Sequence, residues 1–137
     1  MKNQLELALM LAAVGQFCIA VLNLNLIRIM RWQADLARMS LLVREVFQIH
    51  AWFISITLCI FAAFTARFAS EMAAQNQATC RWIACSIGLF WAIRAILQIT
   101  WYSGSHWRGI ASRTVVHIIL LVVYGGFAAV YFIAGFA

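Results

Sequence analysis

The amino-acid sequence predicts an all-α integral membrane protein, a four-helix bundle with up-down-up-down topology. Of the 137 residues, 66% are hydrophobic, only 10% are charged and none is proline. So few charges cannot cover a water-soluble surface. The hydrophobic residues also fall into four long blocks, and each block is close to the ~20 residues that a helix needs to cross ~30 Å of hydrocarbon.

Four transmembrane spans are therefore expected within a single transmembrane domain, 1–137, at residues 7–27, 46–66, 82–102 and 115–137. The spans are apolar nearly all round, whereas the helices of a soluble all-α protein would each show a polar face. The strands of a transmembrane β-barrel would be about half as long and would alternate in polarity. Short connections between the spans favour antiparallel neighbours.

The first connection, Arg28 to Glu45, contains no glycine or proline. Its charged residues recur at intervals of three and four, which predicts a partly helical, amphipathic segment at the head groups. The second connection covers residues 70–79. The third is a tight turn at Ser103, Gly104 and Ser105, where small residues suit a reversal of the chain.

The basic residues predict an orientation. The formal net charge is +6, and the nine arginines and one lysine lie mostly at span ends, so anionic head groups explain the charge better than nucleic acid does. The first and third connections hold six basic residues and the opposite side holds three. We therefore expect a multi-pass protein with both of these connections in the cytoplasm and both termini outside.

Each span also contributes polar residues at a spacing of four or seven, which places them on one helical face. Exposing such groups to lipid is costly, so the polar faces are expected to turn inward and meet in the cytoplasmic half of the bundle. The four pairs, one from each span in chain order, are Gln16 with Asn23, His50 with Thr57, Arg94 with Gln98, and His117 with Tyr124.

Arg94 lies deepest, roughly 13 Å of helix from Ser103 and close to the midplane of the membrane. The four acidic residues of the chain all lie near span ends. A neutral acceptor such as Asn23 or Gln98, a backbone carbonyl, water or a bound anionic ligand is therefore expected to be the partner of Arg94.

His50 and His117 lie at similar depths on different spans, which makes them possible axial ligands of a b-type haem or part of a metal site. No CxxCH, HExxH or Glu-x-x-His motif supports a particular centre. The first hypothesis is a b-type haem or quinone-binding electron-transfer subunit. Its candidate cofactor-binding residues are His50, His117, Arg94, Gln98, Asn23 and Tyr124, of which His50 and His117 are also the candidate metal ligands.

A structural interpretation is that both histidines only join helices by hydrogen bonds. Three alternative functions also stay open: a non-catalytic accessory subunit of a larger membrane complex, an oligomeric transporter or channel module with an anion-attracting Arg94, and, least favoured, an enzyme that acts on lipids. No nucleophile or carboxylate pair indicates catalysis. Gly125, Gly126, Ala128 and Ala129 form a small-residue patch that suits close packing against another helix. The expected partners are the lipid bilayer and other membrane subunits or further copies of the chain.

Overall fold

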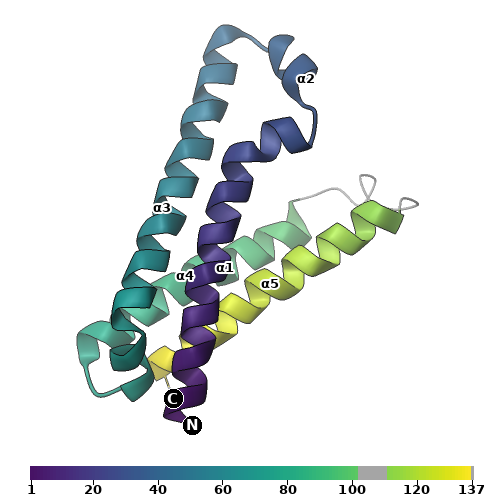
Figure 1. The fold of residues 1–137 in the computed structure, drawn as a ribbon. Helices are drawn as coiled ribbons and strands as arrows, with labels where there is room; N and C mark the ends of the chain where they lie inside the picture. The colour runs from purple at the N-terminus through teal and green to yellow at the C-terminus, as the bar shows by residue number, and fades with distance from the viewer. Residues whose placement is uncertain (102–110, 137) are drawn as a thin grey trace. The chain divides into compact units, whose positions relative to one another are not determined.

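The computed structural model describes residues 1–101 and 111–136, without the side chains of 111–113. These ranges contain five helices and no strand (Figure 1). The helices are α1 (Lys2–Ile29), α2 (Gln33–Ala37), α3 (Leu41–Ala74), α4 (Ala78–Thr100) and α5 (Ala111–Phe136). The all-α fold class is therefore confirmed.

Four of these helices, α1, α3, α4 and α5, are long and apolar enough to cross a membrane. Each contains one of the four predicted spans, except that α4 ends at Thr100 and so leaves out Trp101, and that Tyr102 and Ala137 at two span ends lie outside the described residues. The predicted turn at residues 103–105 also lies outside them. Where the helices extend beyond the spans, they do so because a helix continues into its polar flanks until a cap or turn ends it.

The chain divides into two compact units, one made of Met1–Leu9 with Phe68–Ala137 and the other of Met10–Arg67. Helices α1 and α3 each run through both units. The boundary in α3 coincides with a kink at Phe68, whose φ of −114° and ψ of 15° are not helical. No proline causes this kink, because the sequence contains none.

The first connection is partly helical, as predicted, but its helix α2 has only five residues. Arg31 interrupts the helix with a φ of 55°. Around it, the Arg31 N–H donates to the Arg28 carbonyl at 3.3 Å and the Trp32 N–H donates to the Ile27 carbonyl at 3.0 Å. This pair of bonds is the Schellman pattern, which ends a helix and satisfies its last carbonyls.

Within the unit of residues 10–67, α1 and α3 run antiparallel. Asn23 of α1 contacts Ala51 and Ser55 of α3, and Ser55 also contacts Ala20 of α1. Residue numbers therefore increase along α3 in the direction in which they decrease along α1. Ala20 and Ser55, which meet at this interface, are both buried. Small residues let the two backbones approach, while a polar side chain fixes their register.

In the other unit, α4 and α5 also run antiparallel and approach closely at two glycines. A Cβ atom built at Gly88 of α4 would lie 3.1 Å from the Phe132 ring and 3.2 Å from Tyr131 Cβ. A Cβ atom at Gly135 of α5 would collide with Cys85 Sγ. At Gly135 the Cys85 sulfur fills the space that a side chain would need, whereas at Gly88 a Cβ atom would fit only if Phe132 or Tyr131 moved slightly.

Candidate functional site

Five side chains at the α4–α5 interface form the site, which we call the Arg94 cluster: Trp91, Arg94 and Gln98 from α4, and His117 and Tyr124 from α5. The α4 members are spaced three and four residues apart and the α5 members seven apart, so each set lies on one helical face. Gln98, Trp91 and Tyr124 are buried, whereas Arg94 and His117 are half-buried.

The polar members of the cluster form a continuous chain across the interface. Arg94 Nη1 donates to Gln98 Oε1 at 3.2 Å, and Gln98 Nε2 lies 3.0 Å from His117 Nδ1. Both lengths are within the range of protein hydrogen bonds. Gln98 is thus one of the neutral acceptors expected for Arg94, and it connects the guanidinium to the imidazole.

Aromatic rings enclose the other side of the guanidinium. Arg94 Cζ lies 5.0 Å from the centroid of the Tyr124 ring, within the range of a cation–π interaction. The Trp91 and Tyr124 rings stack at a centroid distance of 5.3 Å, and Phe127 meets Trp91 edge to face at 4.9 Å. Trp91 is only 1% exposed, so it closes this side of the cluster.

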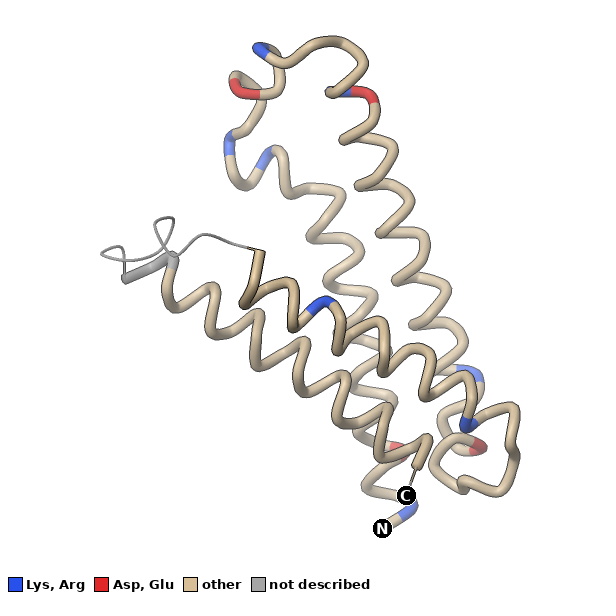
Figure 2. The backbone as a smooth tube through the Cα atoms, turned by 180° about the vertical axis from the view of Figure 1, so that it is seen from behind, with Lys and Arg blue, Asp and Glu red and all other residues tan. Residues whose placement is uncertain are grey.

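The charge of Arg94 is unusual for its position. Figure 2 shows that most charged residues lie near helix ends, whereas Arg94 is followed by six more residues of α4. Those residues correspond to about 9 Å of helix. Arg94 is the only formally charged member of the cluster, and its partners within the cluster, Gln98 and the Tyr124 ring, are neutral. The cluster therefore combines a fixed positive charge with apolar and aromatic surroundings.

A second polar group lies in the unit of residues 10–67. Asn23 Nδ2 donates to the Ala51 carbonyl and to Ser55 Oγ, both at 2.9 Å. The Ser55 hydroxyl then donates to the Ala20 carbonyl at 3.1 Å. Asn23 thus joins α1 to α3 and uses both amide hydrogens to do so. Gln16, predicted on the same face, donates to the Ala12 carbonyl of its own helix at 3.3 Å.

His50 is exposed, although the spacing of polar residues predicts that it turns inward. Its Nδ1 lies 2.8 Å from the Val46 carbonyl one turn earlier in α3, so the helix itself satisfies this nitrogen. Thr57 behaves in the same way and donates to the Phe53 carbonyl at 2.9 Å. Because His50 and His117 belong to different units, their pairing as axial ligands stays a prediction.

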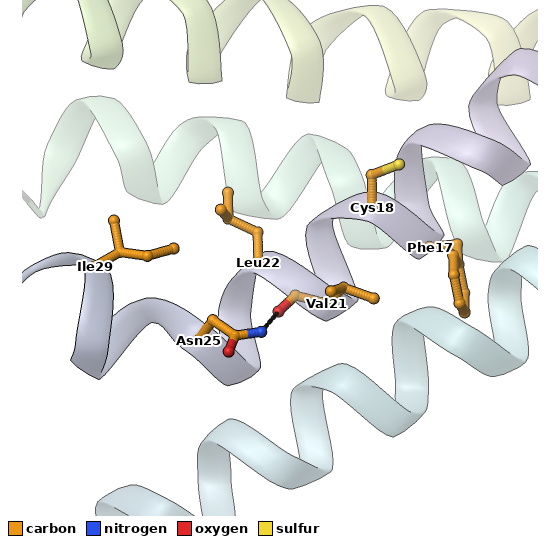
Figure 3. Close-up of a pocket in the computed structure, with 6 residues that line it drawn as sticks. All are labelled: Phe17, Cys18, Val21, Leu22, Asn25 and Ile29. Atoms are coloured by element: carbon orange, nitrogen blue, oxygen red, sulfur yellow. Dashed lines mark hydrogen bonds between the residues drawn. The ribbon is translucent and has the colours of Figure 1, made fainter.

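An open depression along α1 is lined by side chains of that helix, namely Phe17, Cys18, Val21, Leu22, Asn25 and Ile29 (Figure 3). Its lining is almost entirely apolar. Asn25 Nδ2 donates to the Val21 carbonyl at 2.9 Å, so this amide nitrogen is engaged within the helix. A surface of this kind is suited to contact with acyl chains rather than to chemistry.

The described part of the chain contains no group of three His, Cys, Asp or Glu residues that could hold a metal ion. Of the predicted site residues, the structure brings together Arg94, Gln98, His117 and Tyr124, and it places Asn23 with Ser55. Trp91 is not among the residues that the polar pattern of the sequence singles out. Its spacing of three from Arg94 and seven from Gln98 is the signal that could have revealed it.

Four long apolar helices define the chain as a multi-pass integral membrane protein of the all-α class. Comparison with models of protein families, with curated proteins and with solved structures finds no match.

Proposed function

We propose that this chain is a membrane electron-transfer subunit that binds a quinone at the Arg94 cluster. The observation that carries the proposal is the contact of Arg94 with two neutral groups, Gln98 and the Tyr124 ring, inside a pair of apolar helices. A positive charge in a medium of low dielectric constant attracts a ligand whose oxygen atoms carry or gain negative charge.

The residue types of the cluster fit a quinone. Quinones dissolve in the bilayer, their carbonyl oxygens accept hydrogen bonds, and their flat rings pack against aromatic side chains. When bound, a quinone would supply the redox chemistry by taking up electrons and protons at its carbonyl oxygens. The chain's own part is to bind and orient a carbonyl through the Arg94 guanidinium, while Trp91 and Tyr124 exclude water.

A b-type haem is the second ligand class of this proposal. It would require a ring nitrogen from both His50 and His117. Of the two, only His117 belongs to the Arg94 cluster, and Asn23, another predicted cofactor residue, is engaged between α1 and α3. The quinone is therefore the first choice, since it needs only residues that the α4–α5 pair brings together.

Titration of the purified full chain in detergent micelles with a short-chain ubiquinone analogue tests the proposal. Quinones quench nearby tryptophan fluorescence, and Trp91 lies inside the cluster. Arg94→Gln should weaken binding about 10- to 100-fold, because a hydrogen bond to a charged group contributes ~1.5–3 kcal/mol.

The matched control is Arg28→Gln, which removes the same charge from an exposed position in the last turn of α1. This variant should bind the analogue as the unmodified chain does. Equal affinity of the Arg94 and Arg28 variants, or no saturable binding to the unmodified chain, would refute the quinone site. A Soret band in protein from haem-replete cells would favour haem instead.

The second candidate function is a non-catalytic accessory subunit, or a module of an oligomeric transporter or channel, that packs against other membrane subunits or further copies of itself. The supporting observation is that Gly125 and Gly126 are exposed, with no atom within 4 Å of a Cβ built at either position. Gly126→Leu should then lower recovery of crosslinked complexes from membranes. Unchanged crosslinking would contradict this candidate.

The proposed orientation places the first and third connections in the cytoplasm and both termini outside. The charge asymmetry of the connections supports it. Reporter fusions that are active only in the cytoplasm should work at Ser40, in the first connection, and fail at Asn76, in the second. The reverse result would invert the orientation.

A further inference from the structure

We infer that Arg94, acting through Gln98, holds His117 as the neutral tautomer with hydrogen on Nε2, and that His50 adopts the opposite tautomer. The assignment follows from which atoms in each contact can donate and which can only accept. The tautomer of His117 also indicates the class of ligand that the Arg94 cluster binds, and that indication rests on the proposed function.

The orientation of the Gln98 amide is the first step. A guanidinium carries five N–H donors and has no acceptor, so the group of Gln98 that faces Arg94 must be the oxygen. The structure places Gln98 Oε1 there, 3.2 Å from Arg94 Nη1. Turning the amide by 180° would put its NH₂ group against the guanidinium, donor against donor. Arg94 therefore decides which end of the amide reaches His117.

The tautomer of His117 follows from that orientation. The NH₂ group of Gln98 lies 3.0 Å from His117 Nδ1 and can only donate, so Nδ1 must accept with its lone pair. In a neutral imidazole the hydrogen is then on Nε2. A ring nitrogen that carries hydrogen can donate to an oxygen but cannot ligate a metal, so His117 suits a carbonyl ligand and does not suit a haem iron.

His50 provides the opposite case within the same chain. Its Nδ1 lies 2.8 Å from the Val46 carbonyl, which can only accept, so His50 Nδ1 carries a hydrogen, and in the neutral ring Nε2 then has the lone pair. The two histidines predicted as a matched pair of axial ligands thus differ in the atom available for iron. Arg94 and Gln98 are positioning residues, since they set the donor that His117 presents.

Nitrogen NMR of the full chain, labelled with ¹⁵N at histidine and reconstituted in bilayers, tests the tautomers directly. The His50→Gln and His117→Gln variants assign the signals. The His117 spectrum should show a protonated Nε2 and an unprotonated Nδ1, and the His50 spectrum should show the reverse. Hydrogen on Nδ1 of His117, or on both of its nitrogens, would overturn the inference.

Two variants test the role of Gln98 and Arg94. In Gln98→Glu, which has nearly the same shape, a carboxylate faces His117 and accepts, so the hydrogen should move to Nδ1. In Arg94→Leu the amide can turn, and the preference of His117 for Nε2–H should fall to a mixture, while the His50 signals stay unchanged. If the His117 tautomer is the same in both variants, the two residues do not control it.

The quinone titration separates this inference from the proposed function. Nε2–H on His117 in a chain that binds no quinone would leave the tautomer assignment standing and refute the function. Quinone binding by a chain whose His117 carries hydrogen on Nδ1 would support the proposed function and refute the tautomer assignment.

Discussion

Arg81 Nε donates a hydrogen bond to the Gly135 carbonyl at 2.9 Å, so a side chain near the start of α4 satisfies a carbonyl at the end of α5. Gln75, just after α3, does the same for the Ile133 carbonyl at 2.8 Å. The last carbonyls of a helix lack partners within the helix and carry partial negative charge. Arg81 and Gln75 therefore act together as a side-chain cap for α5.

The cap predicts that Arg81→Met destabilises the α4–α5 pair. The substitution keeps an apolar stem but removes the donor and the charge, so the free energy of unfolding should fall by about 1–2 kcal/mol. Titration with SDS in mixed micelles, followed by circular dichroism, measures the change. Arg81→Lys should recover part of the loss because it keeps the charge. Unfolding curves that coincide for Arg81→Met and the unmodified chain would show that the cap contributes nothing.

The close approach of Gly135 to Cys85 leads to the second prediction. Gly135→Ala adds a methyl group that would collide with Cys85 Sγ, so the Cys85 side chain must leave its rotamer or the helices must shift. Overpacking of this kind typically costs about 1–3 kcal/mol. The measurement is again the free energy of unfolding in SDS, and Cys85→Ala in the same chain should relieve much of the penalty, because it removes the sulfur.

Gly125→Ala is the matched control for Gly135→Ala. It makes the same substitution in the same helix at a position where a Cβ meets no atom within 4 Å. Alanine favours a helix by roughly 0.8–1 kcal/mol over glycine, so Gly125→Ala should be neutral or stabilising. Equal losses at both positions would mean that helix flexibility, not contact with Cys85, explains the effect.

The sequence predicts the four long helices because the length and hydropathy of each apolar block can be read along the chain without knowing any tertiary contact. It also predicts that Arg94 shares a face with Gln98, and His117 with Tyr124, because these relationships follow from helical period. The contact of Gln98 with His117 needs a further fact, the register of α4 against α5. That register is set by close packing at Gly88 and Gly135, and glycine in an apolar span gives no periodic signal.

The positions of close packing, the role of Trp91 and the exposure of His50 do not follow from the sequence for related reasons. The small-residue patch at Gly125 and Gly126 suits close packing against another helix. Within the described residues the close packing of α4 and α5 is found at Gly88 and Gly135, and contact of the patch with a further subunit stays a prediction. Trp91 resembles its apolar neighbours in any hydropathy profile, and only its spacing from Arg94 indicates a shared face. His50 shows that spacing alone does not predict burial, since a helix carbonyl satisfies its ring.

The bonds of Asn23 predict that it stabilises the α1–α3 pair. Asn23→Leu removes the donors to the Ala51 carbonyl and Ser55 Oγ, and interhelical hydrogen bonds in membrane proteins contribute about 0.6 kcal/mol each, with maxima near 1.7. The expected loss is about 1–2 kcal/mol in SDS unfolding. Asn25→Leu is the control because Asn25 bonds the Val21 carbonyl of its own helix, so it should change stability by less than about 0.5 kcal/mol. A loss at Asn25 as large as that at Asn23 would contradict the assignment of Asn23 as the connecting residue.

The left-handed backbone of Arg31 predicts that glycine stabilises the end of α1. With a φ of 55°, Arg31 occupies the C′ position of the Schellman motif, where a residue with a side chain is strained by roughly 1–2 kcal/mol. Arg31→Gly relieves that strain but increases the freedom of the unfolded chain, so a net gain of about 0.5–1 kcal/mol is expected.

Arg28→Gly, which has the same loss of charge but lies inside the last turn of α1, should instead lose about 1 kcal/mol. Both variants replace an arginine by glycine near the end of α1, but only Arg31 has a positive φ, so opposite signs in SDS unfolding would attribute the effect to φ. A loss at both positions would mean that the arginine side chain, through its contact with water or head groups, outweighs the strain of its backbone.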